Sequence, residues 1–128
     1  MKAKNFKLFI GYLGNGATVC NSAVYENGDY KTIAHISPAG HIKLYVSADY
    51  IPAADMETIK ATAARHERET RARLDRETAT TYGYMRTLEE IANYTSYTTQ
   101  SAFFEALKEC ATQEARRELV KKTYLENF

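Results

Sequence analysis

Residues 8–46 decide the fold, and they read LFIGYLGNGATVCNSAVYENGDYKTIAHISPAGHIKLYV. Three turn signals divide this stretch: Asn15-Gly16, Asn27-Gly28 and Ser37-Pro38-Ala39-Gly40. The Asn-Gly pair favours the type I′ hairpin turn, in which both central residues adopt positive φ. The turns separate four short apolar segments, each of strand length. We therefore predict a four-stranded antiparallel β-meander over about residues 6–46.

The same turns predict how the strands pair. A two-residue loop at each Asn-Gly turn sets Tyr12 opposite Val19 and Val19 opposite Ile36. A three-residue loop that ends at Gly40, in the left-handed conformation, sets Ile36 opposite Ile42. One face then carries Asn21, Thr32 and the apolar set Leu8, Ile10, Tyr12, Val19, Ala23, Ala34, Ile36, Ile42, Leu44 and Val46. A slip of one residue would move this set to the other face, so the pattern specifies the register.

The opposite face of the predicted sheet is basic and aromatic. Its candidate partner-binding residues are Lys7, Phe9, Lys31, Ile33, His35, Lys43 and Tyr45. Cations beside stacking aromatic rings are typical of open sheets that bind single-stranded nucleic acid. The formal net charge of only +1 argues against this class, because affinity for nucleic acid depends on neutralised phosphates. Contact with a protein and a merely solvated face are the other two interpretations.

The predicted register also brings Cys20 opposite His35, as a nucleophile would lie beside its base. Thiol catalysis needs a lowered thiol pKa and an oriented imidazole, usually with further groups. The middle of a strand offers neither, so we expect no enzyme activity and two reduced, mostly buried cysteines, Cys20 and Cys110. The spacing of His and Cys matches no metal site, so we expect no cofactor and no metal.

A long helix should follow the sheet. Pro52 favours a helix from about Ala53. Its inward stripe at helical spacing is Met56, Ile59, Ala63, His66, Thr70 and Leu74. Because the stripe weakens beyond residue 65, three outcomes stay open for residues 65–78: a frayed arm, packing on the later helix that carries Phe103, or pairing in a dimer.

The long helix also carries four arginines on one broad face. They are the second candidate contact surface: Arg65, Arg68, Arg73 and Arg76. Acidic residues are interleaved with them, which is typical of a solvated helix with ion pairs along its surface. A helix that binds a nucleic-acid groove would be less acidic.

Shorter helices should complete the chain. One is expected around residues 84–91, one after an N-cap at Thr99 or Ser101, and one after an N-cap at Thr112. A polar connection is expected over residues 93–99. An antiparallel sheet with one apolar face must be covered, so we predict an α+β fold with three to four C-terminal helices on that face.

Length and composition limit the function classes. A chain of 128 residues fits a single domain, with a β-meander over 1–50 and a helical half over 51–128. No apolar run approaches the roughly 18 residues of a membrane span, so we expect a cytoplasmic protein with no membrane contact. Ten tyrosines without a tryptophan suit half-buried faces and contact surfaces.

Several runs of the sheet region carry a resemblance: Gly14–Asn21, Glu26–Lys31, Ile33–Ile36 and Ile42–Val46. They resemble small proteins without assigned activity that are encoded on conjugative and phage-derived elements of anaerobic gut bacteria. The resemblance covers about the first 52 residues, and no functional residue can be carried over. It implies an accessory protein that binds a host protein, as inhibitors of CRISPR nucleases and other defence systems do.

The leading hypothesis is thus a non-enzymatic protein of a mobile element that acts by protein–protein interaction, with an anti-CRISPR-like inhibitor of a defence nuclease as one form. The alternatives are a single-stranded nucleic-acid-binding accessory protein and a small enzyme that uses Cys20 and His35. We expect a monomer or a homodimer.

Overall fold

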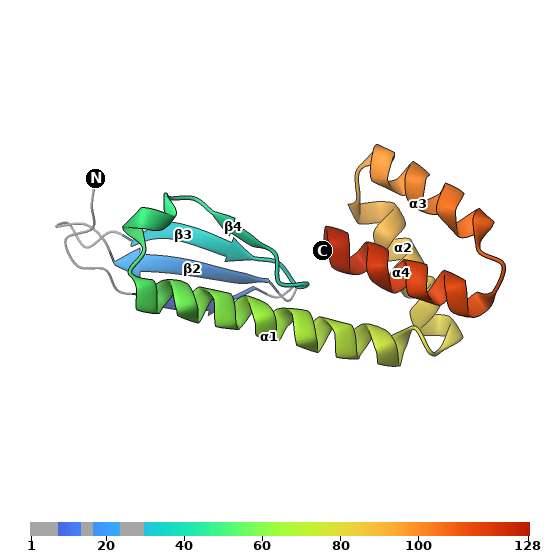
Figure 1. Cartoon of the computed structure of the whole chain (residues 1–128), viewed down its shortest axis with the longest axis horizontal. Helices are drawn as coiled ribbons and strands as arrows, with labels where there is room; N and C mark the ends of the chain where they lie inside the picture. Colours follow the sequence, from blue (N-terminus) through green and yellow to red (C-terminus); the bar gives the residue numbers. More distant parts are fainter. Residues whose placement is uncertain (1–7, 14–16, 24–29) are drawn as a thin grey trace. The chain divides into compact units, whose positions relative to one another are not determined.

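The structure is a computed structural model that describes residues 8–13, 17–23 and 30–128 (Figure 1). Its elements are β1 (Leu8–Tyr12), β2 (Thr18–Ala23), β3 (Tyr30–Ile36), β4 (Ile42–Leu44), the 3-10 helix η1 (Ala48–Tyr50), α1 (Ala53–Glu77), α2 (Thr81–Tyr94), α3 (Tyr97–Glu109) and α4 (Gln113–Asn127). The chain is therefore α+β, as predicted. It divides into two compact units, residues 1–67 and 68–128. The division falls within α1, and not near residue 50.

The strands form one antiparallel sheet in the order β1-β2-β3-β4. The β3–β4 hairpin has the predicted three-residue loop, since the Ser37 amide donates to the His41 carbonyl oxygen over 2.9 Å. Gly40 adopts the predicted left-handed conformation with φ 88°, and Ile36 lies opposite Ile42. The predicted turns at Asn15-Gly16 and Asn27-Gly28 lie outside the described residues.

Strand β2 is paired one residue away from the predicted register, so that prediction is wrong. Tyr12 and Ile36 both lie opposite Thr18. The Leu13 amide donates to the Ala17 carbonyl oxygen over 2.8 Å, so three residues connect this pair where two were expected. A slip of one residue reverses the faces of a strand. The helix-facing side of β2 is consequently formed by Thr18 and Cys20, whose side chains are fully buried.

A β-bulge in β3 is a second departure from the predicted sheet. Cys20 lies opposite Ala34 but Asn21 lies opposite Thr32, which leaves Ile33 as the extra residue. A bulge redirects a side chain, and Ile33 and Ala34 are both buried, at 2% and 0% exposure. Ile33 therefore belongs to the core, not to the opposite face where the sequence pattern placed it.

The first part of α1 covers one face of the sheet (Figure 1). The core of this unit consists of Cys20, Ile33, Ala34, Ile36, Ile51, Ile59 and Ala63. Among the helices, α1 alone contributes buried residues to this described cluster, whereas the buried core residues of α2, α3 and α4 belong to a second cluster. The His66 ring Nε2 lies 2.8 Å from the Thr18 hydroxyl, which satisfies the buried polar groups of both residues.

The β3–β4 turn abuts α1 closely. A Cβ atom at Gly40 would collide with the carbonyl oxygen of Ala63. Ala39 beside it is buried at 4% exposure. The turn therefore needs glycine at residue 40 for two reasons: its positive φ and its lack of a side chain.

Residues 68–128 form a helical unit with its own apolar core. The buried members are Leu74, Tyr84, Ile91, Phe103, Val120 and Tyr124. Leu74 is fully buried in the same cluster as Phe103, so of the three open outcomes for residues 65–78 the structure shows packing within the chain. The surrounding helices can bury this cluster because each contributes apolar residues at helical spacing.

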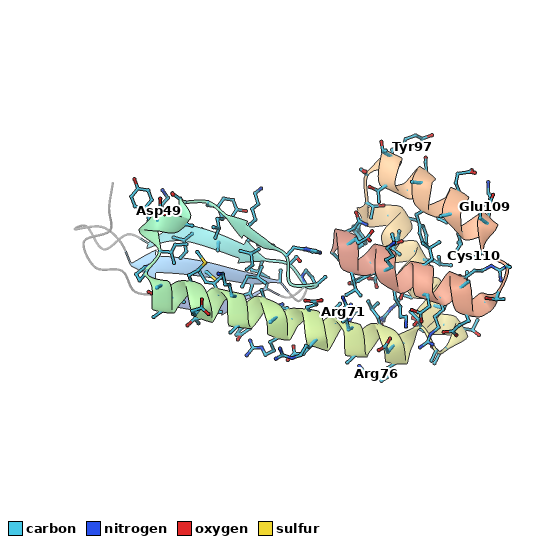
Figure 2. All side chains as sticks on the ribbon, viewed as in Figure 1. Asp49, Arg71, Arg76, Tyr97, Glu109 and Cys110 are labelled. Atoms are coloured by element: carbon cyan, nitrogen blue, oxygen red, sulfur yellow. The ribbon has the colours of Figure 1, made fainter. Side chains whose placement is uncertain are left out.

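Each later helix begins with a hydroxyl cap. The side chains of Thr80, Ser96 and Thr112 accept hydrogen bonds from the backbone amides three residues onward. The cap predicted at Thr112 is confirmed. The prediction of Thr99 or Ser101 for α3 is wrong, because Ser96 starts this helix and shortens the expected connection. Tyr97 and Glu109 mark its two ends in Figure 2.

Candidate functional site

The structure divides the predicted basic and aromatic face. Lys7 lies outside the described residues, and Phe9 is placed only by its strand position opposite Asn21. Ile33 is buried in the core. Lys31 is exposed but pairs with Ser22 beyond the bulge, so by register it lies on the same side of the sheet as Cys20. The predicted basic and aromatic face is therefore not formed as a whole.

Three residues of that face remain together beside the end of the sheet. His35 of β3 lies opposite Lys43 of β4, as predicted. The Lys43 Nζ lies 5.3 Å from the centroid of the Tyr45 ring, within the range of a cation–π contact. Tyr45 is half exposed. Lys43 and Tyr45 are thus accessible to a partner as a small basic and aromatic group.

Strand β4 ends the sheet, and its outer side meets no further strand among the described residues. The His41 carbonyl oxygen accepts from the amide of Ser37, just after β3, over 2.9 Å, and the Tyr45 amide donates to the Ile33 carbonyl oxygen of β3 over 2.8 Å. Backbone groups of successive residues in a strand point to opposite sides. The amides and carbonyls of Ile42 and Leu44 therefore point away from β3, toward the free edge. We call residues 41–45 the open edge.

Apolar side chains accompany these outward backbone groups. Ile42 and Leu44 are 38% and 37% exposed, whereas their cross-strand partners Ile36 and Ala34 are fully buried. The sequence pattern correctly predicted that both residues lie on the helix-facing side. It also placed them within the core, whereas they are only partly buried. Their position on the last strand is the signal that they are only partly covered, because a terminal strand has one neighbour instead of two.

The segment that contains the open edge is basic in sequence. Residues 30–47 contain no Asp or Glu, and their four ionisable basic side chains are Lys31, His35, His41 and Lys43. The next acidic residue is Asp49 on η1, labelled in Figure 2. A partner that approaches β4 therefore meets basic side chains on one side of the strand and apolar ones on the other.

The predicted arginine face has partners within the protein. The Arg65 guanidinium donates to the Tyr12 hydroxyl over 2.9 Å in the first unit. In the second unit, Arg73 donates to the Tyr124 hydroxyl over 2.9 Å and pairs with Glu77 over 3.1 Å. These contacts stabilise the packing of each unit. Two of the four predicted arginines therefore remain as candidates for contact with a partner.

The remaining two arginines are Arg68 and Arg76, which are exposed and form no ion pair with the described part of the chain. Figure 2 labels Arg76 near the end of α1. Their exposed apolar neighbours one turn away in α1 are the small residues Ala64 and Ala72, so they offer charge with little apolar surface to bury.

Cys20 and His35 do not form the pair that the sequence suggested. Cys20 lies opposite Ala34 and is fully buried, while His35 lies opposite Val19 on the neighbouring position of β2. Burial raises the pKa of the Cys20 thiol, which keeps it protonated at neutral pH. This geometry gives no activated nucleophile at Cys20.

The helical unit contains a hollow that the sequence did not indicate. It has a volume of about 590 Å³ and is lined by Thr78, Ala79, Thr80, Thr81, Tyr84, Met85, Gln113, Glu114 and Arg117. Arg117 donates to the Asp75 carbonyl oxygen over 2.7 Å and to the Thr78 hydroxyl over 3.1 Å. Its guanidinium thus caps the end of α1 and is engaged within the unit.

The described residues contain no cluster of His, Cys, Asp and Glu that could hold a metal ion. None of their helices combines the length and the apolar character needed to cross a membrane. Compared with known protein families, curated proteins and solved structures, the chain matches none.

Proposed function

We propose that the chain is a non-enzymatic protein-binding module that acts by covering part of a partner's surface with its open edge. One observation carries this proposal: Ile42 and Leu44 expose more than a third of their surface on a strand whose outward backbone groups have no strand partner among the described residues. Unpaired edge groups beside apolar side chains favour association, because a partner can satisfy the first and bury the second.

The resemblance in the first 52 residues suggests the biological setting. In this setting the chain is an accessory protein of a mobile element, and its partner is a host protein. We include a defence nuclease among the proposed partners, with inhibition by occupation of its surface. Small accessory proteins need no catalytic group for such a role, since blocking a site requires only affinity and position.

Single-stranded nucleic acid is the second candidate, supported by the Lys43–Tyr45 contact. The observations favour it less, because Ile33 is buried and Lys31 lies on the other side of the sheet by register. Nucleic acid also gains little from unpaired backbone groups, whereas a protein can bond to them directly.

A photo-crosslinking residue at position 44 tests the proposal. The full chain is exposed to lysate of an anaerobic gut bacterium, the crosslinked protein is identified, and its affinity is measured with the purified protein. The double variant Ile42→Asp/Leu44→Asp should weaken that affinity at least about tenfold, because it places charge on the buried contact. If the identified protein is a nuclease, its activity is measured with and without the chain.

A matched control replaces two exposed apolar residues of the helical unit. Tyr82 and Met85 are 76% and 56% exposed on α2. The variant Tyr82→Asp/Met85→Asp should retain full affinity for the same protein. Equal losses in both double variants, or loss in the control alone, would contradict the assignment to the open edge.

A further inference from the structure

We infer that the partner contributes an extended segment that joins β4 as an added strand, with apolar side chains beside Ile42 and Leu44 and an acidic side chain beside Lys43. This inference rests on the proposed function and specifies the chemistry of the partner. Recognition of this kind draws affinity from backbone hydrogen bonds and specificity from alternate side chains.

The backbone of β4 is suited to this mode. The pairing of Ser37 with His41 and of Ile33 with Tyr45 sets the alternation along the strand. Ile42 and Leu44 consequently each offer one amide and one carbonyl to the free edge. An antiparallel segment can bond to both residues at once through its own residues i and i+2.

The side chains of β4 alternate in a way that selects the added segment. Ile42 and Leu44 lie on the helix-facing side, and Lys43 lies on the other side, opposite His35. Lys43 falls at a position where an added strand would form a pair without hydrogen bonds, in which side chains approach most closely. A Glu or Asp at that position of the partner would lie beside Lys43, and no acidic residue of segment 30–47 competes for it.

Charge disfavours a second copy of the chain as the occupant. If two β4 strands paired antiparallel with full overlap, Ile42 of each would bond to Leu44 of the other. Lys43 would then lie directly opposite Lys43 of the second copy. Like charges at such a position destabilise a strand pair, whereas an acidic residue stabilises it. The open edge therefore favours a different chain over its own copy.

Synthetic peptides test the inference with the full chain. The probe is a blocked five-residue peptide of order Thr-Val-Glu-Val-Thr, and the control peptide has Lys in place of Glu. NMR measures the affinity of each and the hydrogen exchange of the Ile42 and Leu44 amides. We expect the Glu peptide to bind, to slow exchange at both amides, and to bind about fivefold or more tightly than the Lys peptide.

Two variants isolate the backbone and the charge. Leu44→Pro removes the outward amide hydrogen while the inward bond of Tyr45 stays, since proline is tolerated on the outer side of an edge strand. The Leu44→Pro variant should lose binding of the Glu peptide, and the Leu44→Val variant should keep it. Lys43→Glu should reverse the preference between the two peptides, and it supplies the test by itself if Leu44→Pro fails to fold.

Three results would overturn the inference. The first is peptide binding that leaves exchange at Ile42 and Leu44 unchanged or that survives Leu44→Pro. The second is a dimer, seen by sedimentation, that dissociates in Leu44→Pro. The third is failure of the Glu peptide to bind while single-stranded oligonucleotides bind through Lys43.

The proposed function has a separate outcome. A crosslinked protein whose binding is lost in Ile42→Asp/Leu44→Asp but retained in Leu44→Pro would keep the open edge as the binding surface. The same result would exclude strand addition, so failure of one proposal is distinguishable from failure of the other.

Discussion

The two units of the chain complete their backbone hydrogen bonding in different ways. In residues 68–128, helices bond internally and their starts are closed by the hydroxyls of Thr80, Ser96 and Thr112. In residues 1–67, the sheet bonds strand to strand, and the outer backbone groups of its last strand have no strand partner in the part of the chain that the structure describes. A helical unit can thus be complete by itself, whereas an open sheet always retains an edge that must be protected or used.

The cores differ as well. The helical unit buries aromatic and aliphatic side chains such as Phe103 and Leu74 together. The sheet unit buries smaller residues and a polar pair, Thr18 with His66. A small core gains less from apolar burial, so individual residues in it carry a larger share of the stability.

The largest effect is expected from a charge in the sheet core. Ile36→Asp should lower the free energy of unfolding by more than about 4 kcal/mol, because Ile36 is fully buried and the carboxylate would have no partner. Lys31→Asp, at an exposed position, should change it by less than about 0.5 kcal/mol. Chemical denaturation of both variants decides the matter, and similar midpoints would mean that Ile36 does not lie in the core.

A cavity in the helical core should have the next largest effect. Leu74→Ala should cost about 2–5 kcal/mol, since Leu74 is fully buried. Hydrogen exchange should show the loss of protection mainly within residues 68–128. Met85→Ala, at an exposed site of the same unit, is the control and should stay near wild type. Equal loss of protection in both units would show that they unfold as one.

The turn of the sheet unit can be tested at Gly40. Gly40→Ala should cost about 1–3 kcal/mol, because it combines a positive φ with a collision against the Ala63 carbonyl oxygen. Gly40→Asn separates the two causes, since Asn tolerates positive φ but still carries a Cβ. Thermal unfolding should show a smaller loss for the Asn variant than for the Ala variant, and the loss that remains in the Asn variant is due to the collision. A near-wild-type Asn variant would mean that the turn can move away from α1.

A cap of the helical unit should have a smaller effect. Thr112→Ala should cost about 1 kcal/mol, because the Thr112 hydroxyl accepts the Ala115 amide over 3.0 Å. Thr112→Ser keeps the hydroxyl and should remain within a few tenths of a kcal/mol. Urea denaturation checks both, and an unchanged Ala variant would indicate that water replaces the cap.

The smallest effect concerns pH and the exposed charges around Lys121. Its Nζ lies 2.9 Å from an Asp75 oxygen and 2.8 Å from a Glu118 oxygen, and it lowers the pKa of both carboxyls from 3.8 and 4.5. A carboxyl with a lowered folded-state pKa stabilises the fold above its unfolded pKa and loses this as pH falls. Melting temperatures across pH 6 to 3 should therefore decline less steeply in Lys121→Met. Parallel curves would show that screening by solvent removes the interaction.

Much of the helical pattern follows from local signals. Pro52 and the stripe from Met56 to Leu74 gave the start and the inward side of α1, because periodicity reports the buried side of a helix directly. The hairpin loop before His41 was also predicted from local sequence signals. Ser96 was missed because Ser96, Thr99 and Ser101 are equivalent as caps until the position of the helix is known.

The errors lie where distant residues decide. Val19 is more apolar than Thr18, so the pattern placed Val19 inside. Thr18 is buried instead because His66, 48 residues later, provides its hydrogen bond. The bulge at Ile33 likewise has no local signature and reverses the sides of the strand before it. With these two changes, the predicted binding face lost Ile33 and Lys31, while Ile42 and Leu44 entered as candidates.

The contact between the Gly40 turn and α1 also affects how the neighbouring strand can associate. A free hairpin tip samples many shapes, and a partner must select one of them at a cost in chain entropy. Here Gly40, which lies two residues before Ile42, packs closely against the Ala63 carbonyl oxygen. Strand β4 is thus already extended before any partner arrives, so association spends little of its free energy on ordering this chain.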